Sequence, residues 1–369
     1  GGILKENELP QSKPDGFAER MPTLSGGAFC HLPISGVTPP LSGEVASRSD
    51  DGEGSYSPAL QSFSRNDTIR PNRNAPLPGF PVREKEANHM SMNTVPERLA
   101  ALRAAMAANG VAVYLIPVGD PHASEYLPCH YTSLTWFSGF HGENSNLVVT
   151  RTGSALWADG RYFVQAEKEL AGTEIELQRM GEPGVPTVEE YCANALNEGE
   201  VLGLCGLTAS TALVNDLKKA LEKKGAFIKT LNLEDELWTE GRPALPATPA
   251  WILPKEYAGF SPAEKLDQLR SKLKELGCTA QFVGKLDHLA WLLNLRAMDI
   301  ECTPYAMAYC YVTPSRAVLF INTARVTPEA KAELEANGIT LAEYDDVLKF
   351  LAAETEPQTV LAECATVNY

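Results

Sequence analysis

The feature that most constrains the fold is an internal repeat with an offset of 167 residues. Each copy reads as a helix ending at a glycine, then a strand, an aspartate, a segment with a tryptophan, and two more strands. Leucines recur by chance on amphipathic helices, whereas a glycine and an aspartate at one offset are harder to explain that way. We therefore predict two copies of one α/β fold. The matched pairs are Leu99 and Leu266, Leu102 and Leu269, Arg103 and Arg270, Gly110 and Gly277, and Asp120 and Asp287.

Local patterns predict the elements of each copy. Capping boxes, in which Ser or Thr precedes Glu by three residues, predict helix starts at Thr94, Thr187 and Ser261. Residues 111–117 are apolar without polar alternation, which indicates a buried, central strand. The predicted fold class is α/β, with a mixed β-sheet flanked by helices in each of two tandem domains. Further strands are predicted at 147–150, 155–158, 201–205 and 227–231, and helices at 162–170 and 210–224.

Residues 1–91 differ from the rest of the chain in composition. Glycine, proline and serine make up about a third of residues 1–90, and no helical or strand period persists there. Such a segment buries too little apolar surface to offset its conformational entropy, so we predict that it is disordered. Because Met90 and Met92 precede the first helix, we interpret the segment as sequence upstream of the true start. The alternative is a regulatory tail with phosphorylatable serines.

Proline density separates the two predicted domains. Prolines recur through residues 243–254, and proline at that density stops both helices and central strands. We predict a first domain at 92–243, a proline-rich linker at 244–259, and a second domain at 260–369. The second domain is expected to be incomplete at its C-terminus.

Charge and cysteine content exclude several classes of function. The formal net charge of −15 argues against nucleic acid or an anionic membrane as the main partner. No apolar run approaches the roughly 20 residues that cross a bilayer. The eight cysteines are scattered without a C-x-x-C pair, as expected of reduced thiols in a cytosolic protein. We therefore predict a cytoplasmic location.

Motifs for a self-contained active site are not written in the sequence. It has no H-E-x-x-H, no G-x-S-x-G and no P-loop, so we predict neither catalytic residues nor metal ligands. Asp120 and His122 form a candidate ligand pair, but the proline between them indicates a turn, and no partner cluster accompanies them. Asp287 is interpreted as the N-cap of a helix over 289–295.

One constellation stands out at residues 157–163, Trp-Ala-Asp-Gly-Arg-Tyr-Phe. An apolar strand ends there in an Asp-Gly turn, where functional groups are commonly presented. Arg161 would stand just outside the sheet, where a guanidinium suits a peptide carbonyl or a carboxylate. The alternative is a surface arginine that pairs with Asp159 or Glu125, and the local pattern does not separate the two.

Four motifs in order carry a resemblance to a known family. Residues 119–126 resemble Gly-Asp-x-His-x-Ser-Glu-Tyr, and residues 137–142 resemble a Ser-Gly-Phe-x-Gly turn. Residues 157–163 resemble Trp-x-Asp-Gly-Arg-Tyr-Phe, and residues 286–296 resemble Leu-Asp-x-x-Ala-Trp-Leu-x-Asn-Leu-Arg. On these motifs, the chain from Thr94 onward resembles the first two domains of three-domain Xaa-Pro aminopeptidases, within the creatinase/prolidase group.

The resemblance implies that the parent enzyme removes the N-terminal residue from peptides with proline in second position. It also implies a catalytic domain of the pita-bread fold, in which two Asp, one His and two Glu hold two divalent metal ions, usually manganese. That ligand set is not present in this sequence. We therefore expect a fragment that holds no cofactor itself and is inactive alone. The full-length enzyme is expected to form a homodimer through the catalytic domain that this fragment lacks.

The resemblance further implies that the first domain walls the substrate cleft and supplies Arg161 to the bound peptide. Glu125 either orients Arg161 or only stabilises the loop at 120–126, and the second role is favoured. Two stretches depart from the family pattern. Residues 143–145 are Glu-Asn-Ser in place of Ser-Ala-Gly, and Thr-Pro stands at 303–304 in place of Asn-Pro.

Two other classes of protein stay open. A non-catalytic aminopeptidase-P-like module that binds other proteins is compatible with the acidic charge. Prolidases and creatinases have one N-terminal domain before the catalytic one, and the internal repeat argues against them.

Overall fold

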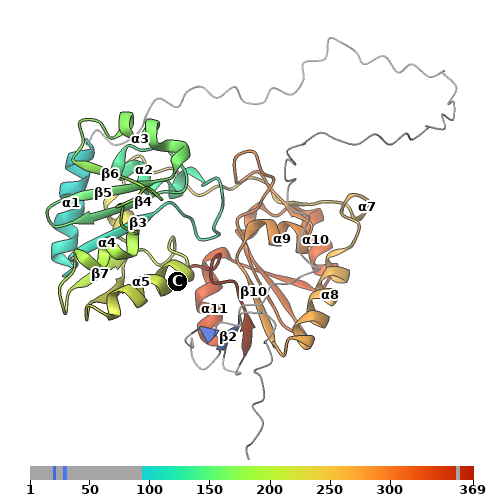
Figure 1. Cartoon of the computed structure of the whole chain (residues 1–369). Coiled ribbons are helices and arrows are strands. Elements are labelled where there is room, and N and C mark those ends of the chain that lie inside the picture. The colour runs from blue at the N-terminus through green and yellow to red at the C-terminus, as the bar shows by residue number, and fades with distance from the viewer. Residues whose placement is uncertain (1–19, 22–27, 31–93, 355–357) are drawn as a thin grey trace, which may run out of the picture. The chain divides into compact units, whose positions relative to one another are not determined.

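The computed structural model describes residues 20–21, 28–30, 94–354 and 358–369 (Figure 1). All of these residues belong to one compact unit. Most of the segment predicted to be disordered lies outside these residues. Its described parts are two short strands, β1 (Arg20–Met21) and β2 (Ala28–Cys30). Within the described part of the chain, no helix has both the length and the apolar character needed to cross a membrane.

The first sheet has six strands in the order β6-β5-β4-β3-β7-β8. Its central strand β3 is buried at every residue, as the uniform apolar pattern predicts, and it pairs antiparallel with β4 and parallel with β7. The sheet is therefore mixed. The strands are β3 (Val113–Pro117), β4 (Asn146–Thr150), β5 (Ser154–Ala158), β6 (Ile175–Arg179), β7 (Val201–Leu204) and β8 (Phe227–Thr230).

Helices cover both faces of this sheet. Tyr114 and Ile116 of β3 pack with residues of α1, α2, α3 and α6, whereas Val113 and Leu115 pack with α4 and α5. Alternate side chains of one strand thus enter two different cores. The helices are α1 (Val95–Ala108), α2 (Ser133–Ser138), α3 (Phe163–Glu169), α4 (Val188–Asn194), α5 (Thr211–Glu222) and α6 (Leu233–Leu237).

The second sheet follows the order β1-β2-β15-β10-β12-β13-β14. Its strands from the second half of the chain are β10 (Ala280–Val283), β12 (Tyr309–Val312), β13 (Ala317–Phe320), β14 (Ile339–Ala342) and β15 (Thr359–Leu361). One face packs against α8 (Pro262–Glu275), α9 (Leu286–Leu292) and α10 (Pro328–Ala336), and the other against α11 (Val347–Ala353). The predicted fold class, two domains with mixed sheets flanked by helices, is confirmed.

The two domains that repeat in sequence also repeat the same strand pairing and the same helix-to-hairpin contact. Strands β3-β4-β5-β6 pair in the same sequence of antiparallel, antiparallel and parallel neighbours as β10-β12-β13-β14. Arg103 Nε donates to the carbonyl of Thr150 at 2.9 Å, and Arg270 Nε donates to that of Thr313 at 3.1 Å. Each arginine therefore ties the first helix of its domain to the hairpin that follows the central strand.

The region between the sheets contributes structure of its own. Within the predicted linker 244–259, β9 (Trp251–Ile252) pairs antiparallel with β11 (Leu295–Arg296), and α7 (Lys255–Ala258) follows it. The interpretation of Asp287 as a helix N-cap is wrong, because α9 begins at Leu286 with Lys285 as its N-cap. Asp287 still lies in the first turn, where its charge favours the helix dipole.

A buried carboxyl beneath the first sheet predicts an unusual pH dependence of stability. Glu234 of α6 is buried and accepts a hydrogen bond from the Tyr114 hydroxyl. Burial raises the pKa of Glu234 to about 7, although the bond from Tyr114 opposes the shift. The folded state holds this proton, whereas the unfolded state releases it near pH 4.3. The contribution of Glu234 to the free energy of unfolding is therefore fully present below about pH 4.3 and is lost as pH rises toward 7.

Between about pH 5 and pH 8, the wild type is expected to lose about 2–3 kcal/mol of its free energy of unfolding through Glu234, and Glu234→Gln is expected to abolish this loss. Urea unfolding of wild type and variant at about pH 5 and pH 8 measures it. Glu236→Gln is the matched control, since Glu236 lies exposed on the same helix. Equal pH dependence in wild type and Glu234→Gln would contradict the prediction.

Candidate functional site

The turn that carries Arg161 follows directly after β5. Asp159 is the N-cap of a short 3-10 helix, η2 (Gly160–Tyr162), and its Oδ1 accepts the backbone N–H of Arg161 at 2.9 Å. The strand is buried along its whole length, so the turn is held by a rigid element.

The Arg161 side chain is paired with Asp159 and stays open on one edge. Its Nε donates to both carboxylate oxygens at 3.1 Å, and its Nη2 donates to Oδ2 at 2.7 Å. The side chain is 65% exposed, and Nη1 has no hydrogen bond to any described residue. Its guanidinium holds the pKa of the Asp159 carboxyl well below its usual range. The structure therefore selects Asp159 as the partner and leaves donors of the guanidinium facing solvent.

Residues of the neighbouring loop frame this guanidinium. Tyr162 stacks beneath it, with 5.2 Å between the Arg161 Cζ and the ring centre. The Tyr162 hydroxyl donates to Glu143 at 3.0 Å, and Asn144 Nδ2 donates to Asp159 Oδ2 at 3.2 Å. Asn144 has a φ of +48°, a left-handed conformation that asparagine tolerates. The loop that departs from the family pattern thus supports the arginine in this chain.

The structure does not bring Glu125 to Arg161. Glu125 is exposed and forms no hydrogen bond or ion pair with any described residue. Its charge acts instead on Tyr305 of the second domain, as one of several smaller contributions to a pKa that burial raises. The role of Glu125 in the loop at 120–126 stays a prediction.

Asp120 and His122 lie together, but not as metal ligands. Asp120 Oδ1 accepts the backbone N–H groups of His122 and Ser124, each at 2.9 Å, which closes the turn expected from the proline between them. Both ring nitrogens of His122 are taken by other groups of the protein. Across residues 94–354 and 358–369, no group of three or more His, Cys, Asp or Glu is placed to hold a metal ion.

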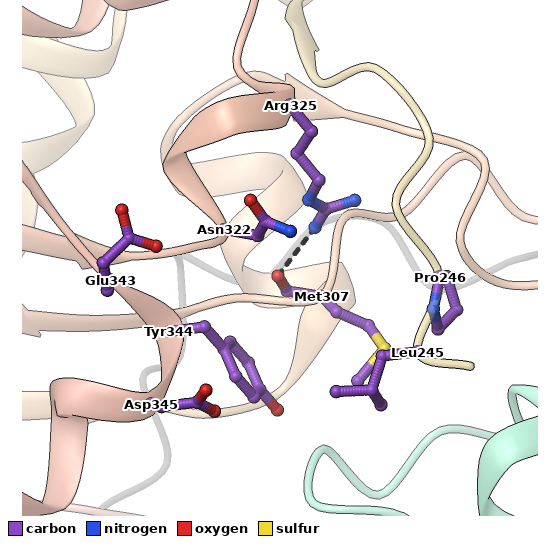
Figure 2. Close-up of a pocket in the computed structure, with 8 residues that line it drawn as sticks. All are labelled: Leu245, Pro246, Met307, Asn322, Arg325, Glu343, Tyr344 and Asp345. Carbon is purple, nitrogen blue, oxygen red and sulfur yellow. Dashed lines mark hydrogen bonds between the residues drawn. The ribbon is translucent and has the colours of Figure 1, made fainter.

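The second domain has a corner at the same place in its fold, and a pocket of about 230 Å³ lies in front of it (Figure 2). Asn322 follows β13 as the N-cap of η3 (Thr323–Arg325), just as Asp159 follows β5. Figure 2 shows the arginine of this corner pointing at the carbonyl of Met307, to which its Nη2 donates at 2.8 Å. Arg325 also pairs with Asp299, and both side chains are almost completely buried.

Among the described residues, only one of the two corners thus has an arginine with free donors facing solvent. The Arg325 guanidinium binds a carboxylate and two backbone carbonyls, those of Met307 and Thr248, and serves to hold the second domain together. The Arg161 guanidinium keeps free donors on a rigid turn. Sequence reasoning missed the role of Arg325, because Asn322 and Arg325 match no motif that the first corner would suggest.

Family models for the creatinase/prolidase N-terminal domain match this chain twice, at residues 98–237 and at residues 241–369. The chain is 38% identical over 260 residues to aminopeptidase P2 of Arabidopsis thaliana, and 38% identical over 263 residues to a probable Xaa-Pro aminopeptidase P of Sordaria macrospora. These matches cover 69% and 70% of this chain, but only 36% and 42% of the two relatives.

A solved structure of an X-prolyl aminopeptidase is also similar to this chain over part of its length. The X-prolyl aminopeptidase of Caenorhabditis elegans, described as a cytosolic enzyme with a di-nuclear active site, matches with a TM-score of 0.69 and 32% sequence identity. The match covers 74% of this chain and 47% of that chain. In each of these three comparisons, the match therefore spans less than half the length of the relative.

Proposed function

Because this chain contains two creatinase/prolidase N-terminal domains and belongs to the Xaa-Pro aminopeptidase family, we propose that it is the substrate-positioning part of an enzyme that removes the N-terminal residue from peptides with proline in second position. The observation that supports this proposal most directly is that the Arg161 guanidinium is fixed on the Asp159 turn and has unused donors facing solvent. The proposed domain boundaries are 92–243 and 260–369, with the linker 244–259 between them.

In this proposal, Arg161 binds a carbonyl or carboxylate of the peptide. A planar guanidinium offers paired donors in a fixed geometry, which orients a peptide better than a single point charge. Its role is to place the peptide, since the carboxylates described beside it, Asp159 and Glu143, are bonded to Arg161 and to the Tyr162 hydroxyl. Bond cleavage belongs to residues elsewhere in the enzyme.

Metal chemistry is proposed for the part of the enzyme that this chain does not span. The described residues do not fit a di-metal centre, because no cluster of His, Cys, Asp or Glu forms a ligand set within them. We propose that the two divalent ions, manganese by family resemblance, are held by the catalytic domain, and that the homodimer forms through it. A cytosolic location is proposed from the description of the C. elegans enzyme.

Purified as the 369-residue chain, the protein is expected to release no N-terminal residue from an Xaa-Pro peptide, with or without added manganese. The physical reason is the lack of a ligand set that could activate water within the described residues. Mass spectrometry of the peptide over several hours measures it. The C. elegans enzyme, run in parallel, shows that the assay detects turnover. Manganese-dependent release by this chain would contradict the proposal.

A further inference from the structure

The loop after β3 carries an imidazole from the first domain into the second. His122 is completely buried, its Nδ1 lies 2.7 Å from the carbonyl oxygen of Gly284, and its Nε2 lies 2.7 Å from the Tyr344 hydroxyl. The ring also packs against Tyr309 of β12 in a tilted arrangement, with 4.4 Å between the ring centres. Both domains lie in the same compact unit, so these are contacts across their junction.

The carbonyl of Gly284 determines which nitrogen of the neutral imidazole carries the proton. A carbonyl oxygen can only accept a hydrogen bond, so Nδ1 carries the proton that points at Gly284. In the neutral ring, Nε2 is then an acceptor, and it accepts a hydrogen bond from the Tyr344 hydroxyl. A second proton on the ring would make Nε2 a donor, and the Tyr344 hydroxyl would then have to turn and accept its bond. The ring is completely buried, and it is this loss of solvation that disfavours the imidazolium relative to the neutral ring.

Among the described residues, no carboxylate forms a hydrogen bond or an ion pair with the ring that would compensate a positive charge. Asp120 on the same loop uses Oδ1 for two backbone N–H groups, and its buried Oδ2 has no hydrogen-bond partner. Lys285, next to Gly284, is paired with Asp287 at 3.3 Å. Burial lowers the pKa of His122, and the charge of Asp120 opposes this only in part. The other titratable or charged groups around the ring are Tyr131, Asp299, Tyr309, Arg325 and Tyr344.

We propose that His122 is a pH-sensitive clasp between the two domains, which holds their junction closed as the neutral imidazole and opens it on protonation. The remaining junction contacts include two backbone bonds, from Thr211 N to the carbonyl of Val367 and from Ala212 N to that of Cys364, each 2.8 Å long. These bonds carry no titratable group. They therefore report whether the junction is open without responding to pH themselves.

The sign follows from linkage. An imidazole released to solvent takes up a proton below about pH 6.5, whereas the buried ring resists it. Neutral His122 therefore contributes its full stabilisation above about pH 6.5, and the contribution is lost as pH falls below that value. One proton is taken up on opening, so the opening constant rises up to about tenfold for each pH unit in this window.

Hydrogen exchange tests the clasp in the whole chain. The protection factors of the Thr211 and Ala212 amides, corrected for intrinsic exchange, are measured between about pH 5 and pH 8. In the wild type they are expected to fall up to about tenfold per pH unit below about pH 6.5. In His122→Gln, which cannot titrate, they are expected to be lower at neutral pH and independent of pH. Protection of Leu115 in β3 shows that the first sheet itself stays folded.

Two control variants separate His122 from other histidines. His130 lies near the linker, its Nδ1 is 2.7 Å from the carbonyl of Pro243, and burial also lowers its pKa. His288 lies at the start of α9, and its ring has no hydrogen bond to a described residue. His130→Gln and His288→Gln are both expected to keep the wild-type pH dependence. If His130→Gln abolishes it, the clasp is assigned to the wrong residue.

Tyr344→Phe keeps the test decisive if His122→Gln fails to fold. It removes only the hydroxyl that bonds Nε2, so the Thr211 and Ala212 amides are expected to lose protection at neutral pH and still respond to acid. Nitrogen NMR of the imidazole in the wild type is expected to show protonated Nδ1 and unprotonated Nε2 at pH 7. Flat protection in the wild type, the same acid response in His122→Gln, or the opposite tautomer would overturn the proposal.

Discussion

Replacing Arg161 by alanine in the enzyme that carries all its domains is expected to lower kcat/KM for an Xaa-Pro peptide about ten- to a hundredfold. The free energy of one charge-assisted hydrogen bond to a peptide group corresponds to a change of that size in kcat/KM. Such a bond would form at the solvent-facing edge of this guanidinium. Arg161→Lys is expected to restore only part of the loss, because an ammonium cannot reproduce the planar fork. Steady-state kinetics on a short peptide series measures both.

Thermal unfolding of the same variants decides between binding and structure. Arg161 is exposed and pairs only with a neighbour on its own turn, so its removal is expected to leave the melting temperature nearly unchanged. Arg151→Ala is the matched control, since Arg151 is similarly exposed and pairs with Glu200, away from the corner. A lower melting temperature with normal kinetics in Arg161→Ala would mean that the arginine only pins the Asp159 turn.

The largest loss of stability is expected from Asp299→Ala. Asp299 accepts bonds from the Met307 N–H and the Thr248 hydroxyl, each at 2.7 Å, and pairs with buried Arg325. Removing the carboxylate leaves a guanidinium buried without its counter-charge, which typically costs about 3–5 kcal/mol. Urea unfolding of the chain at neutral pH measures the loss.

An exposed ion pair of the same domain provides the comparison. Asp267 is 77% exposed and lies 3.5 Å from Arg270, so Asp267→Ala is expected to cost under about 1 kcal/mol. Should Asp299→Ala cost no more than this control, the buried Asp299–Arg325 pair would not be what holds Thr248 and Met307 in place.

Features written within a few residues could be predicted from the sequence, because their physics is local. The capping boxes at Thr187 and Ser261 form as predicted, since the cap and its Glu partner lie three residues apart. The uninterrupted apolar run at 111–117 predicts a strand covered on both faces, and β3 is that strand. Asp287 shows the limit of such reasoning, because several residues near a helix start can serve as its cap, and Lys285 does so here.

The partner of Arg161 illustrates a choice that only the tertiary structure decided. Asp159 and Glu125 are both plausible from the sequence, and the turn after β5 brings only the first within reach. The proline between Asp120 and His122 predicts only a turn, yet the ring of His122 bonds a tyrosine 222 residues further along the chain.

The sequence by itself determined many of the elements, the repeat and the family of this protein, since helix caps, apolar periods and motifs are read over short stretches. Which charged groups meet, which stay open and which are buried was decided only by the tertiary structure. The corners after β5 and β13 occupy the same place in their sheets, yet one arginine faces solvent and the other is enclosed by Asp299. Burial and pairing depend on what residues distant in the chain place around a group, and that environment sets its charge and its chemistry.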